Sequence, residues 1–513
     1  MRRFFLALVL LSVPASAAAQ AAHDHGATIA GRIPRDIIER PVPIREGIGK
    51  VSHPTSTKSK EAQAFYEQGL AYLHSYVWLE AARSFNQAIR LDGGFALAWV
   101  GLSRAYTGLE DAEMARDAQK HAEAIKDVTP REARWIDVRA KQLEAMAVRR
   151  DNIERADGAQ YAYIKAIDAA LEGDPMDAEL WTLRGNAEEP NGAFGRGQRG
   201  TASSIAFYER AIALAPGHFG AHHYLIHSYE QIGHFDKALE HGKVYADAAS
   251  EVPHALHMYA HDLMKLGRTG EAIEVFGRAR TLEHAYYARE NIARDFDWHH
   301  AHNLALLALS HRHEGQLDEA EALLREGASV GQSSPVRKGY YQGVLLDLLY
   351  ARGRHDEVVR EARELSTWTQ LPVKALGHAL AARSLMAQGR HADAAPHIEV
   401  LAKSGSEAGM YGIYADLQAG LALGEHELRT GKRAEGAQRL RAVMTRARGQ
   451  RSPDGWIEGL FTLESVFEIA RATGEWDLAA DAAARLMEHD KAYAGSQEAA
   501  RVIAVRAAES RRP

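Results

Sequence analysis

Residues 64–92 read AFYEQGLAYLHSYVWLEAARSFNQAIRLD, and the spacing of this stretch decides the fold. Counted from Ala62 as position 1, the small residues Gly69 and Ala81 fall at positions 8 and 20. The bulky Phe85 falls at position 24, in the second half of the stretch. Apolar side chains that recur every three to four residues predict amphipathic helices, and small residues opposite large ones let two helices pack closely. The stretch therefore predicts a pair of antiparallel helices.

The same pattern recurs at intervals of about 34 residues along the chain. Trp99, Tyr106 and Ala115 mark a second copy at the matching offsets. Later copies share a turn in which a glycine and polar residues lead to the residue at position 20. These turns are GHFDKA ending at Ala238, GRTGEA at Ala272, GQLDEA at Ala320, GRHDEV at Val358, GRHADA at Ala394, GKRAEG at Gly436 and GEWDLA at Ala479.

This series resembles the tetratricopeptide repeat (TPR) family over residues 59–505. The resemblance implies an all-α fold, a right-handed superhelical solenoid of antiparallel helix pairs with about 10–11 units. One hairpin cannot bury its apolar face alone, so stacked neighbours share a core and leave one concave surface. TPR arrays mostly bind proteins or peptides there, and the resemblance therefore implies a protein or peptide partner in the concave groove.

The N-terminal residues 1–21 read as a signal peptide. Arg2 and Arg3 precede the apolar run FFLALVLLSV at residues 4–13, and small residues follow. The run is too short to span a bilayer, and no later segment reaches the roughly 18 apolar residues of a membrane helix. We therefore expect a cleaved signal, no membrane span and a periplasmic or secreted protein. The other segments outside the array are an extended N-terminal segment (22–58), an inserted loop (186–200) and a C-terminal tail (506–513).

Composition excludes several classes of function. The 513 residues include 62 Lys+Arg against 68 Asp+Glu, with a net charge of -6. No basic surplus is available to neutralise phosphates, which argues against a nucleic-acid partner. The chain has no Cys, so disulfides and thiolate metal sites are excluded. Signatures of serine hydrolases and of phosphate-binding glycine loops are also absent from the sequence.

Histidine is the residue type that departs from average, because 15 of the 26 histidines lie in residues 218–313. With Ala238 at position 20, His223 and His227 take positions 5 and 9 of one unit. In the next unit His257 and His261 take the same positions. Residues four apart lie one turn apart on the same face of a helix. Each pair is therefore expected to point one way, on helices that are neighbours in the stack.

Three further residues join this register. His254 and His302 take position 2 of their units, and Glu230 takes position 12. In TPR families positions 2, 5, 9 and 12 of the first helix line the concave groove, so the resemblance implies that the whole set shares one cavity.

A transition-metal site is one interpretation of this set. Packed helices lie about 8–10 Å apart, so two imidazole pairs can reach a shared metal, with Glu230 as a further oxygen ligand. Imidazole-rich sites suit zinc or copper first, and also nickel or iron. Neither pair encloses the Glu of a metalloprotease helix, because the intervening residues are YLI and MYA. A histidine-lined groove that binds an anion or peptide with pH dependence stays open as a second interpretation, and no shared site as a third.

Other polar residues surround this set. Asp297 either orients a ligating imidazole or caps the helix that follows it. His218 and His313 fall at turns or outer faces, where we expect them to be solvated. The further groups placed in the groove or behind the ligands are Glu188, Glu189, Arg196, Arg199, His299 and His300.

The segments HHYLIHSYE, PHALHMYAHDL and DWHHAHNL together resemble a group of exported bacterial TPR proteins with a His-rich middle section. That resemblance implies a common His-lined site and no particular reaction. We expect an exported binding or interaction protein with a histidine-rich metal site, rather than an enzyme. The alternatives are a metal-dependent enzyme, hydrolytic or oxidative, and a metal-free scaffold for a protein or peptide.

Overall fold

The computed structural model describes residues 33–148, 153–189, 201–332, 334–405, 410–450 and 452–509. Helices dominate this part of the chain, and no strand occurs in it. The signal-peptide prediction lies outside the described residues. Arg196 and Arg199 of the inserted loop lie outside them as well.

Within the described ranges, eleven consecutive helical hairpins form the array, which confirms the all-α solenoid of antiparallel helix pairs. A short helix α1 (Arg35–Ile38) precedes them and α24 (Ala494–Glu509) follows them. The pairs are α2 (Lys60–His74) with α3 (Trp78–Leu91), α4 (Ala96–Gly108) with α5 (Ala112–Ala124), α6 (Pro130–Val148) with α7 (Ile153–Gly173), α8 (Ala178–Glu188) with α9 (Thr201–Leu214), α10 (Phe219–Ile232) with α11 (Phe235–Ala248), α12 (Pro253–Lys265) with α13 (Thr269–Glu290), α14 (Trp298–His313) with α15 (Leu317–Ser329), α16 (Pro335–Ala351) with α17 (His355–Ser366), α18 (Leu371–Ala387) with α19 (His391–Lys403), α20 (Met410–Arg429) with α21 (Arg433–Arg448), and α22 (Pro453–Thr473) with α23 (Trp476–His489).

The first hairpin shows why this sequence pairs its helices. The ring of Phe85 on α3 is fully buried and lies against Gly69 of α2 and Gly101 of α4. A Cβ atom at either glycine would overlap the ring, so only glycine allows the three helices to approach this closely. Ala81 and Ala115, the residues at position 20 of the first two units, are also fully buried.

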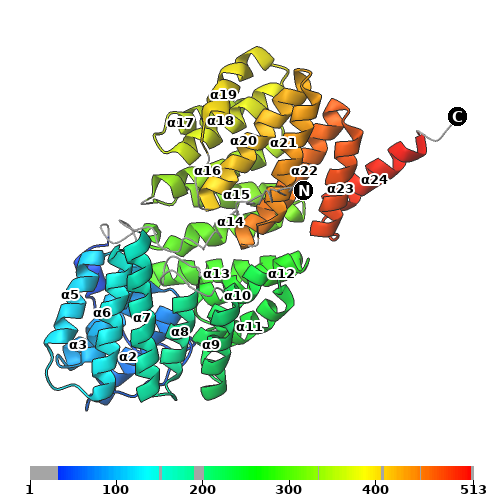
Figure 1. Cartoon of the computed structure of the whole chain (residues 1–513). Coiled ribbons are helices and arrows are strands. Elements are labelled where there is room, and N and C mark those ends of the chain that lie inside the picture. Colours follow the sequence, from blue (N-terminus) through cyan, green and yellow to red (C-terminus); the bar gives the residue numbers. More distant parts are fainter. Residues whose placement is uncertain are drawn as a thin grey trace, which may run out of the picture.

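The array turns back on itself twice. Figure 1 shows two lobes, one of α2–α13 and one of α14–α24. Helix α10 contacts α2 of the first hairpin, and α22 of the last hairpin contacts both α12 and α14. Hairpins five, six and seven are therefore covered from both ends of the chain, and the inner faces of their first helices become interior.

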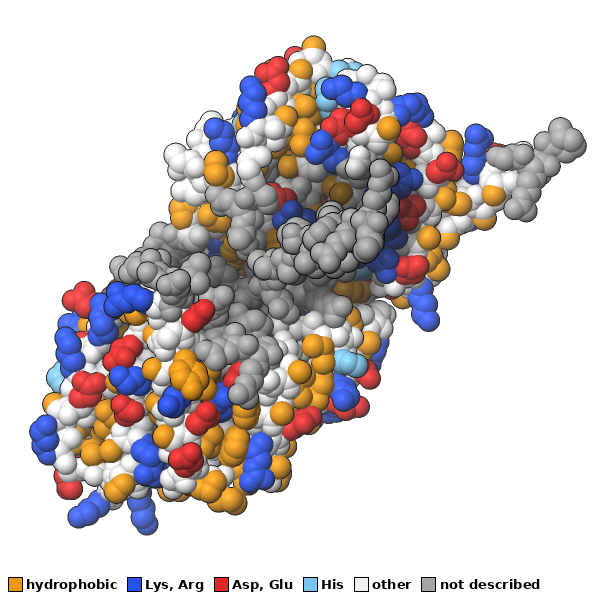
Figure 2. All heavy atoms as spheres, in the orientation of Figure 1, with side chains coloured by type: hydrophobic (Ala, Val, Ile, Leu, Met, Phe, Trp, Pro, Cys, Tyr) orange, Lys and Arg blue, Asp and Glu red, His pale blue; other side chains and the backbone are white. Residues whose placement is uncertain are grey.

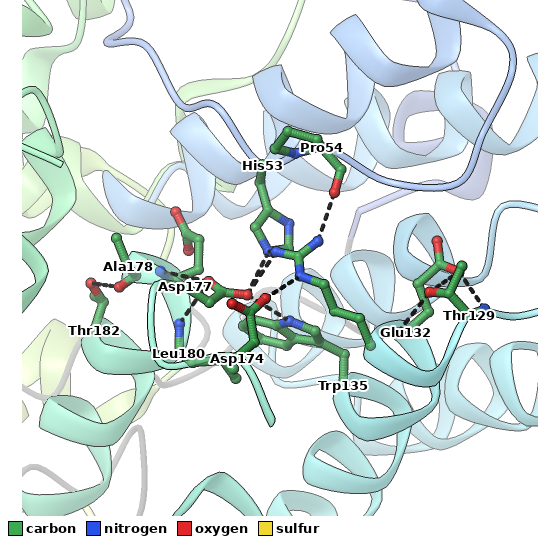
Figure 3. A network of polar contacts seen from close by, with 12 residues as sticks. His53, Pro54, Thr129, Glu132, Trp135, Asp174, Asp177, Ala178, Leu180 and Thr182 are labelled. Carbon is green, nitrogen blue, oxygen red and sulfur yellow. Dashed lines mark hydrogen bonds and ion pairs between the residues drawn. The ribbon is translucent and has the colours of Figure 1, made fainter. Parts of the chain in front are cut away.

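An N-terminal strap, defined as residues 33–58, packs against several distant hairpins. The main-chain N–H of Glu251 donates to the carbonyl of Gly47 at 2.9 Å, before α12 begins. Further along the strap, His53 lies 3.3 Å from Asp177, the N-cap of α8, and its ring packs edge-on against Trp135 of α6. Figure 3 shows His53 and Asp177 directed toward one another in this network. The strap therefore ties the first half of the array together.

The visible surface carries both signs of charge. Figure 2 shows Lys and Arg side chains interspersed with Asp and Glu over both lobes on this face. Among the described residues, none of the helices combines the length and apolar character needed to cross a bilayer.

Candidate metal centre

Two groups of three histidines lie where hairpins five, six and seven meet. The first trio comprises His223 and His227 of α10 with His254 of α12. Its Nε2 atoms face one another, because His223 Nε2 lies 3.1 Å from His227 Nε2 and 3.2 Å from His254 Nε2. The three residues come from two neighbouring helices, as the register predicts.

The second trio comprises His257 and His261 of α12 with His302 of α14. The Nε2 atoms of His257 and His261 are 2.6 Å apart, and the ring centroids of His257 and His302 are 4.7 Å apart. In each trio, one nitrogen from every residue lies within 4.8 Å of the other two. The six predicted histidines therefore gather, but in two places.

This division differs from the expectation that both i, i+4 pairs share one centre. Each pair instead takes its third histidine from position 2 of the following unit. The rings of His254 and His257, three residues apart on α12, are 6.1 Å apart and join the trios. His299 lies between them, with its ring 5.0 Å from that of His254 and 4.5 Å from that of His257.

Oxygen atoms hold the outer nitrogen of several rings. His223 Nδ1 lies 2.5 Å from the main-chain carbonyl of His74, and His257 Nδ1 lies 2.9 Å from Oδ1 of Asn303. A carbonyl oxygen only accepts, so each Nδ1 carries the proton that it donates. The lone pair of these two rings is then on Nε2, the atom that faces the other histidines of the trio.

Glu230 lies behind both trios rather than among their Nε2 atoms. Its two oxygens are 3.7 Å from His227 Nδ1 and from His261 Nδ1, while Lys265 Nζ donates to it at 2.5 Å. Burial would raise the pKa of Glu230, but the ammonium of Lys265 holds it well below its usual value. Glu230 is therefore a charged group beside one ring of each trio, a different position from the ligand role considered for it.

Glu283 of α13 is a functional residue that sequence reasoning missed. Its Oε1 accepts from His299 Nδ1 and its Oε2 accepts from His300 Nδ1, both at 2.8 Å. Burial raises the pKa of Glu283, but these hydrogen bonds outweigh it and leave a net lowering. The signal available in the sequence was the length of α13, whose last two turns extend past its partner helix and carry this carboxylate.

Asp297 caps α14 and does not orient a histidine ring. Its carboxylate accepts from the main-chain N–H of His299 at 2.9 Å and from the hydroxyl of Tyr287 at 2.7 Å. Of the two roles open to Asp297, the structure shows the helix cap. Glu283 takes the orienting role instead.

The first and last hairpins cover the histidines. Tyr76, between α2 and α3, places its ring 4.7 Å from His223 and 5.5 Å from His254. Asp454, in the first turn of α22, lies 3.3 Å from His302 Nδ1. Neither residue was predicted, because each comes from a hairpin remote in sequence.

Burial sets the charge state of two histidines in the second trio. Burial lowers the pKa of His257 well below its usual value, and the neighbouring histidines, His261 among them, add to this effect. Burial likewise lowers the pKa of His261 to about 4, although Glu230 opposes the shift. Both rings are therefore neutral at pH 7, the state in which imidazole binds a metal.

The two glutamates at the end of α8 lie in different surroundings. Glu189 accepts a hydrogen bond at 2.5 Å from Ser228 of α10, the residue that follows His227. Burial raises the pKa of Glu189. Glu188 pairs instead with Arg184 at 2.5 Å. Glu189 is therefore the one that lies beside the helix of the first trio.

A third buried cluster was also missed. Glu179 lies 3.0 Å from His74 Nε2 and 3.1 Å from His218 Nε2. His218 also accepts from the N–H of Ala221 through Nδ1. The expectation that His218 is solvated is wrong, as it is for His313, because both rings are buried against carboxylates. The polar side chains of this cluster hydrogen-bond to one another, so we interpret the cluster as a structural network.

No family model and no curated protein matches this sequence. Among solved structures, the crystal structure of yeast Tom70 is similar to this chain with a TM-score of 0.40 and 11% sequence identity. The similarity covers 82% of this chain and 90% of the Tom70 chain. The architecture described above rests on the packing of this chain's own helices.

Proposed function

We propose that the protein is a helical-repeat metal-binding protein that holds one transition-metal ion in each histidine trio. The observation that carries this proposal is the convergence of Nε2 atoms in the first trio, at 3.1 and 3.2 Å from His223. Four nitrogens around an ion at bonds of about 2.0–2.1 Å would be separated by about 3.3 Å. Both distances from His223 in the first trio thus match edges of a tetrahedral site.

The surroundings of the trios support the same proposal. His223 and His257 each donate their Nδ1 proton to an oxygen, which is how metal-binding histidines are usually oriented. Nitrogen-only donors favour zinc or copper, with nickel or iron as the less favoured ions. Three protein ligands leave a fourth position for water or another molecule, the arrangement of zinc sites that react rather than only stabilise. A protein or peptide partner in the groove stays a prediction of the sequence, and a metal-dependent enzyme stays the alternative to a binding protein.

Elemental mass spectrometry of the tag-free protein tests the proposal. We expect about two ions per chain after incubation with zinc or copper salts and gel filtration. The double variant His223→Ala/His257→Ala removes one ligand from each trio and should retain almost none. The matched control His234→Ala/His391→Ala changes two exposed histidines and should keep the wild-type content. A wild-type protein that stays free of metal, or a double variant that keeps it, contradicts the proposal.

We further propose that the protein is exported, since Arg2, Arg3 and the apolar run at residues 4–13 form a signal sequence. Expression of the full chain followed by N-terminal sequencing of the periplasmic fraction tests this. A mature protein that starts after Ala19 or Ala21 is expected. A full-length protein that remains in the cytoplasm would contradict export.

A further inference from the structure

A cavity of about 360 Å³ adjoins the first trio. Its lining includes the N-terminal strap, the turn between α2 and α3, the start of α12 and the junction between α13 and α14. At one extreme of the lining, Ile44 of the strap is 50% exposed; at the other, His254 and His299 are 2% and 4% exposed. The cavity therefore leads from the surface toward the histidines, and His254 belongs both to its wall and to the first trio.

Aromatic rings form much of the wall. Tyr76 and Trp78 stack at 4.9 Å between centroids on the side of the first hairpin. Phe296 and Trp298 lie on the side of the seventh hairpin, and the indole N–H of Trp298 donates to the carbonyl of Tyr76 at 3.3 Å. Flat aromatic faces on two sides of a small cavity favour a flat, largely apolar ligand.

Two glutamates of the lining are held in ion pairs with arginines. Glu80 is buried and accepts from Tyr286 at 2.8 Å and from Arg83 at 2.6 Å. Glu290 accepts from Arg45 and from Arg83. These pairs balance the charge along this side, and a charged ligand would have to leave water for an aromatic wall. The cavity therefore favours a neutral molecule.

Among the buried polar atoms of the lining that have no hydrogen-bond partner in the described part of the chain are the indole Nε1 of Trp78 and the Nε2 of His299. The indole N–H of Trp78 can only donate a hydrogen bond. His299 donates a hydrogen bond from Nδ1–H to Glu283, so its Nε2 is an acceptor. A group that both donates and accepts, such as a phenol hydroxyl or the two nitrogens of an azole, matches this combination.

We propose that this cavity binds a neutral, flat aromatic molecule with an azole-like or phenol-like polar group placed beside the first trio. The placement of the ligand next to an ion rests on the proposed metal-binding function. The binding of an aromatic molecule in the cavity does not depend on that function. When an ion is bound, the lone pair of the azole nitrogen or of the phenol oxygen would supply the fourth donor that three histidines leave open, in place of the hydrogen bond from Trp78, while the N–H or O–H still donates to His299. The molecule is then a ligand or substrate of the bound ion.

Isothermal titration calorimetry with 4-phenylimidazole at pH 8 tests the ligand class. We expect binding to chelator-treated wild-type protein, and binding at least about tenfold weaker for benzoate, which has similar aromatic character but a negative charge. Zinc-loaded protein should bind 4-phenylimidazole about tenfold more tightly than chelator-treated protein. Benzoate binding as tight as 4-phenylimidazole would overturn the neutral class.

A filling variant tests the location. Leu282 of α13 lines the cavity, and Leu282→Trp should weaken 4-phenylimidazole at least about tenfold. The neighbouring Thr281 is exposed and is not part of the lining, so Thr281→Trp should bind like wild type. Should Leu282→Trp fail to fold by circular dichroism, Leu282→Phe is expected to show a smaller loss in the same direction. Unchanged binding in the folded filling variant overturns the proposal.

Metal content of the same samples separates this proposal from the metal-binding function. If the protein holds zinc but does not bind 4-phenylimidazole, the proposed metal-binding function is supported and the proposed aromatic ligand site is overturned. Protein that binds the probe without taking up zinc overturns the function and supports the aromatic pocket. Equal affinity in zinc-loaded and stripped protein contradicts the placement of the ligand beside the ion.

Discussion

The Nδ1 atom of His257 donates a hydrogen bond to Oδ1 of Asn303 at 2.9 Å, across the contact between α12 and α14. The amide nitrogen of Asn303 donates in turn to Glu283 at 3.3 Å and to the carbonyl of Phe276 at 3.4 Å. This chain fixes which side of the amide faces the ring. The lone pair of His257 therefore faces its partners in the second trio, whether or not an ion is bound.

Asn303→Leu tests the role of this hydrogen bond. The variant keeps the approximate volume of the side chain but removes the acceptor that holds His257, and such losses behind a metal ligand typically weaken metal binding about 10–100-fold. We expect this loss of affinity for the ion of the second trio and not for the ion of the first trio, measured by competition with a chromophoric zinc chelator. Ser310→Ala on the same helix is the control, since Ser310 is buried but contacts Met264. Equal affinity of wild type and Asn303→Leu for both ions would show that the orientation is unimportant.

Metal removal is predicted to destabilise the array. The trios join hairpins five, six and seven, so an ion binds the folded state and not the separated helices. An ion present at 100 times its Kd stabilises the folded state by about 2.7 kcal/mol. Differential scanning calorimetry should therefore show a lower Tm after EDTA treatment and recovery on adding zinc. The variant His223→Ala/His257→Ala should have the same Tm with and without zinc; a zinc-dependent rise in this variant would place the stabilising ion elsewhere.

The local repeat could be predicted from sequence because it depends on contacts within one or two hairpins. Gly69 and Phe85 are 16 residues apart, and their fit follows from the spacing alone. The i, i+4 pairs fall on one face for the same reason. These local rules also placed His254 and His302 in the correct register.

The groups that complete the centre could not be predicted in this way. Tyr76 and Asp454 reach the histidines because hairpin one meets hairpin five and hairpin eleven meets hairpins six and seven. Those meetings depend on a small rotation between neighbouring units, summed over several units. Residue spacing does not specify that sum. The division into two trios has the same origin, since it depends on how far each helix slides past the next.

The pair formed by His313 and Asp490 predicts a pH dependence of stability. His313 at the end of α14 bonds Asp490, beyond α23, at 2.8 Å, while Glu314 contacts its other ring nitrogen at 3.0 Å. Burial lowers the pKa of His313, but the bond to Asp490 outweighs it and the net shift is upward. For Asp490, burial raises the pKa and the bond to His313 outweighs it, so the net shift is downward.

Because the pKa of His313 is raised, its contribution to the stability of the fold is complete at pH values below the ordinary pKa of histidine. This contribution is lost as the pH rises through the raised pKa. The contribution of Asp490 is lost as pH falls through its lowered value. His313→Gln should therefore cost about 1.5–3 kcal/mol of unfolding free energy at pH 5.5 and clearly less at pH 9, by urea denaturation. His391→Gln, at an exposed position, is the control and should leave the profile unchanged. A cost that is larger at pH 9 than at pH 5.5 has the wrong sign for this pair.

The most direct test of the central claim is anomalous diffraction from crystals of the zinc-loaded protein, recorded just above and just below the zinc absorption edge. We predict one peak within each trio, bonded to Nε2 atoms at about 2.0–2.1 Å. The first peak should lie among His223, His227 and His254, and the second among His257, His261 and His302. Peaks confined to the partly exposed group of His284, His300 and Glu326, or no peak at either trio, would contradict the account.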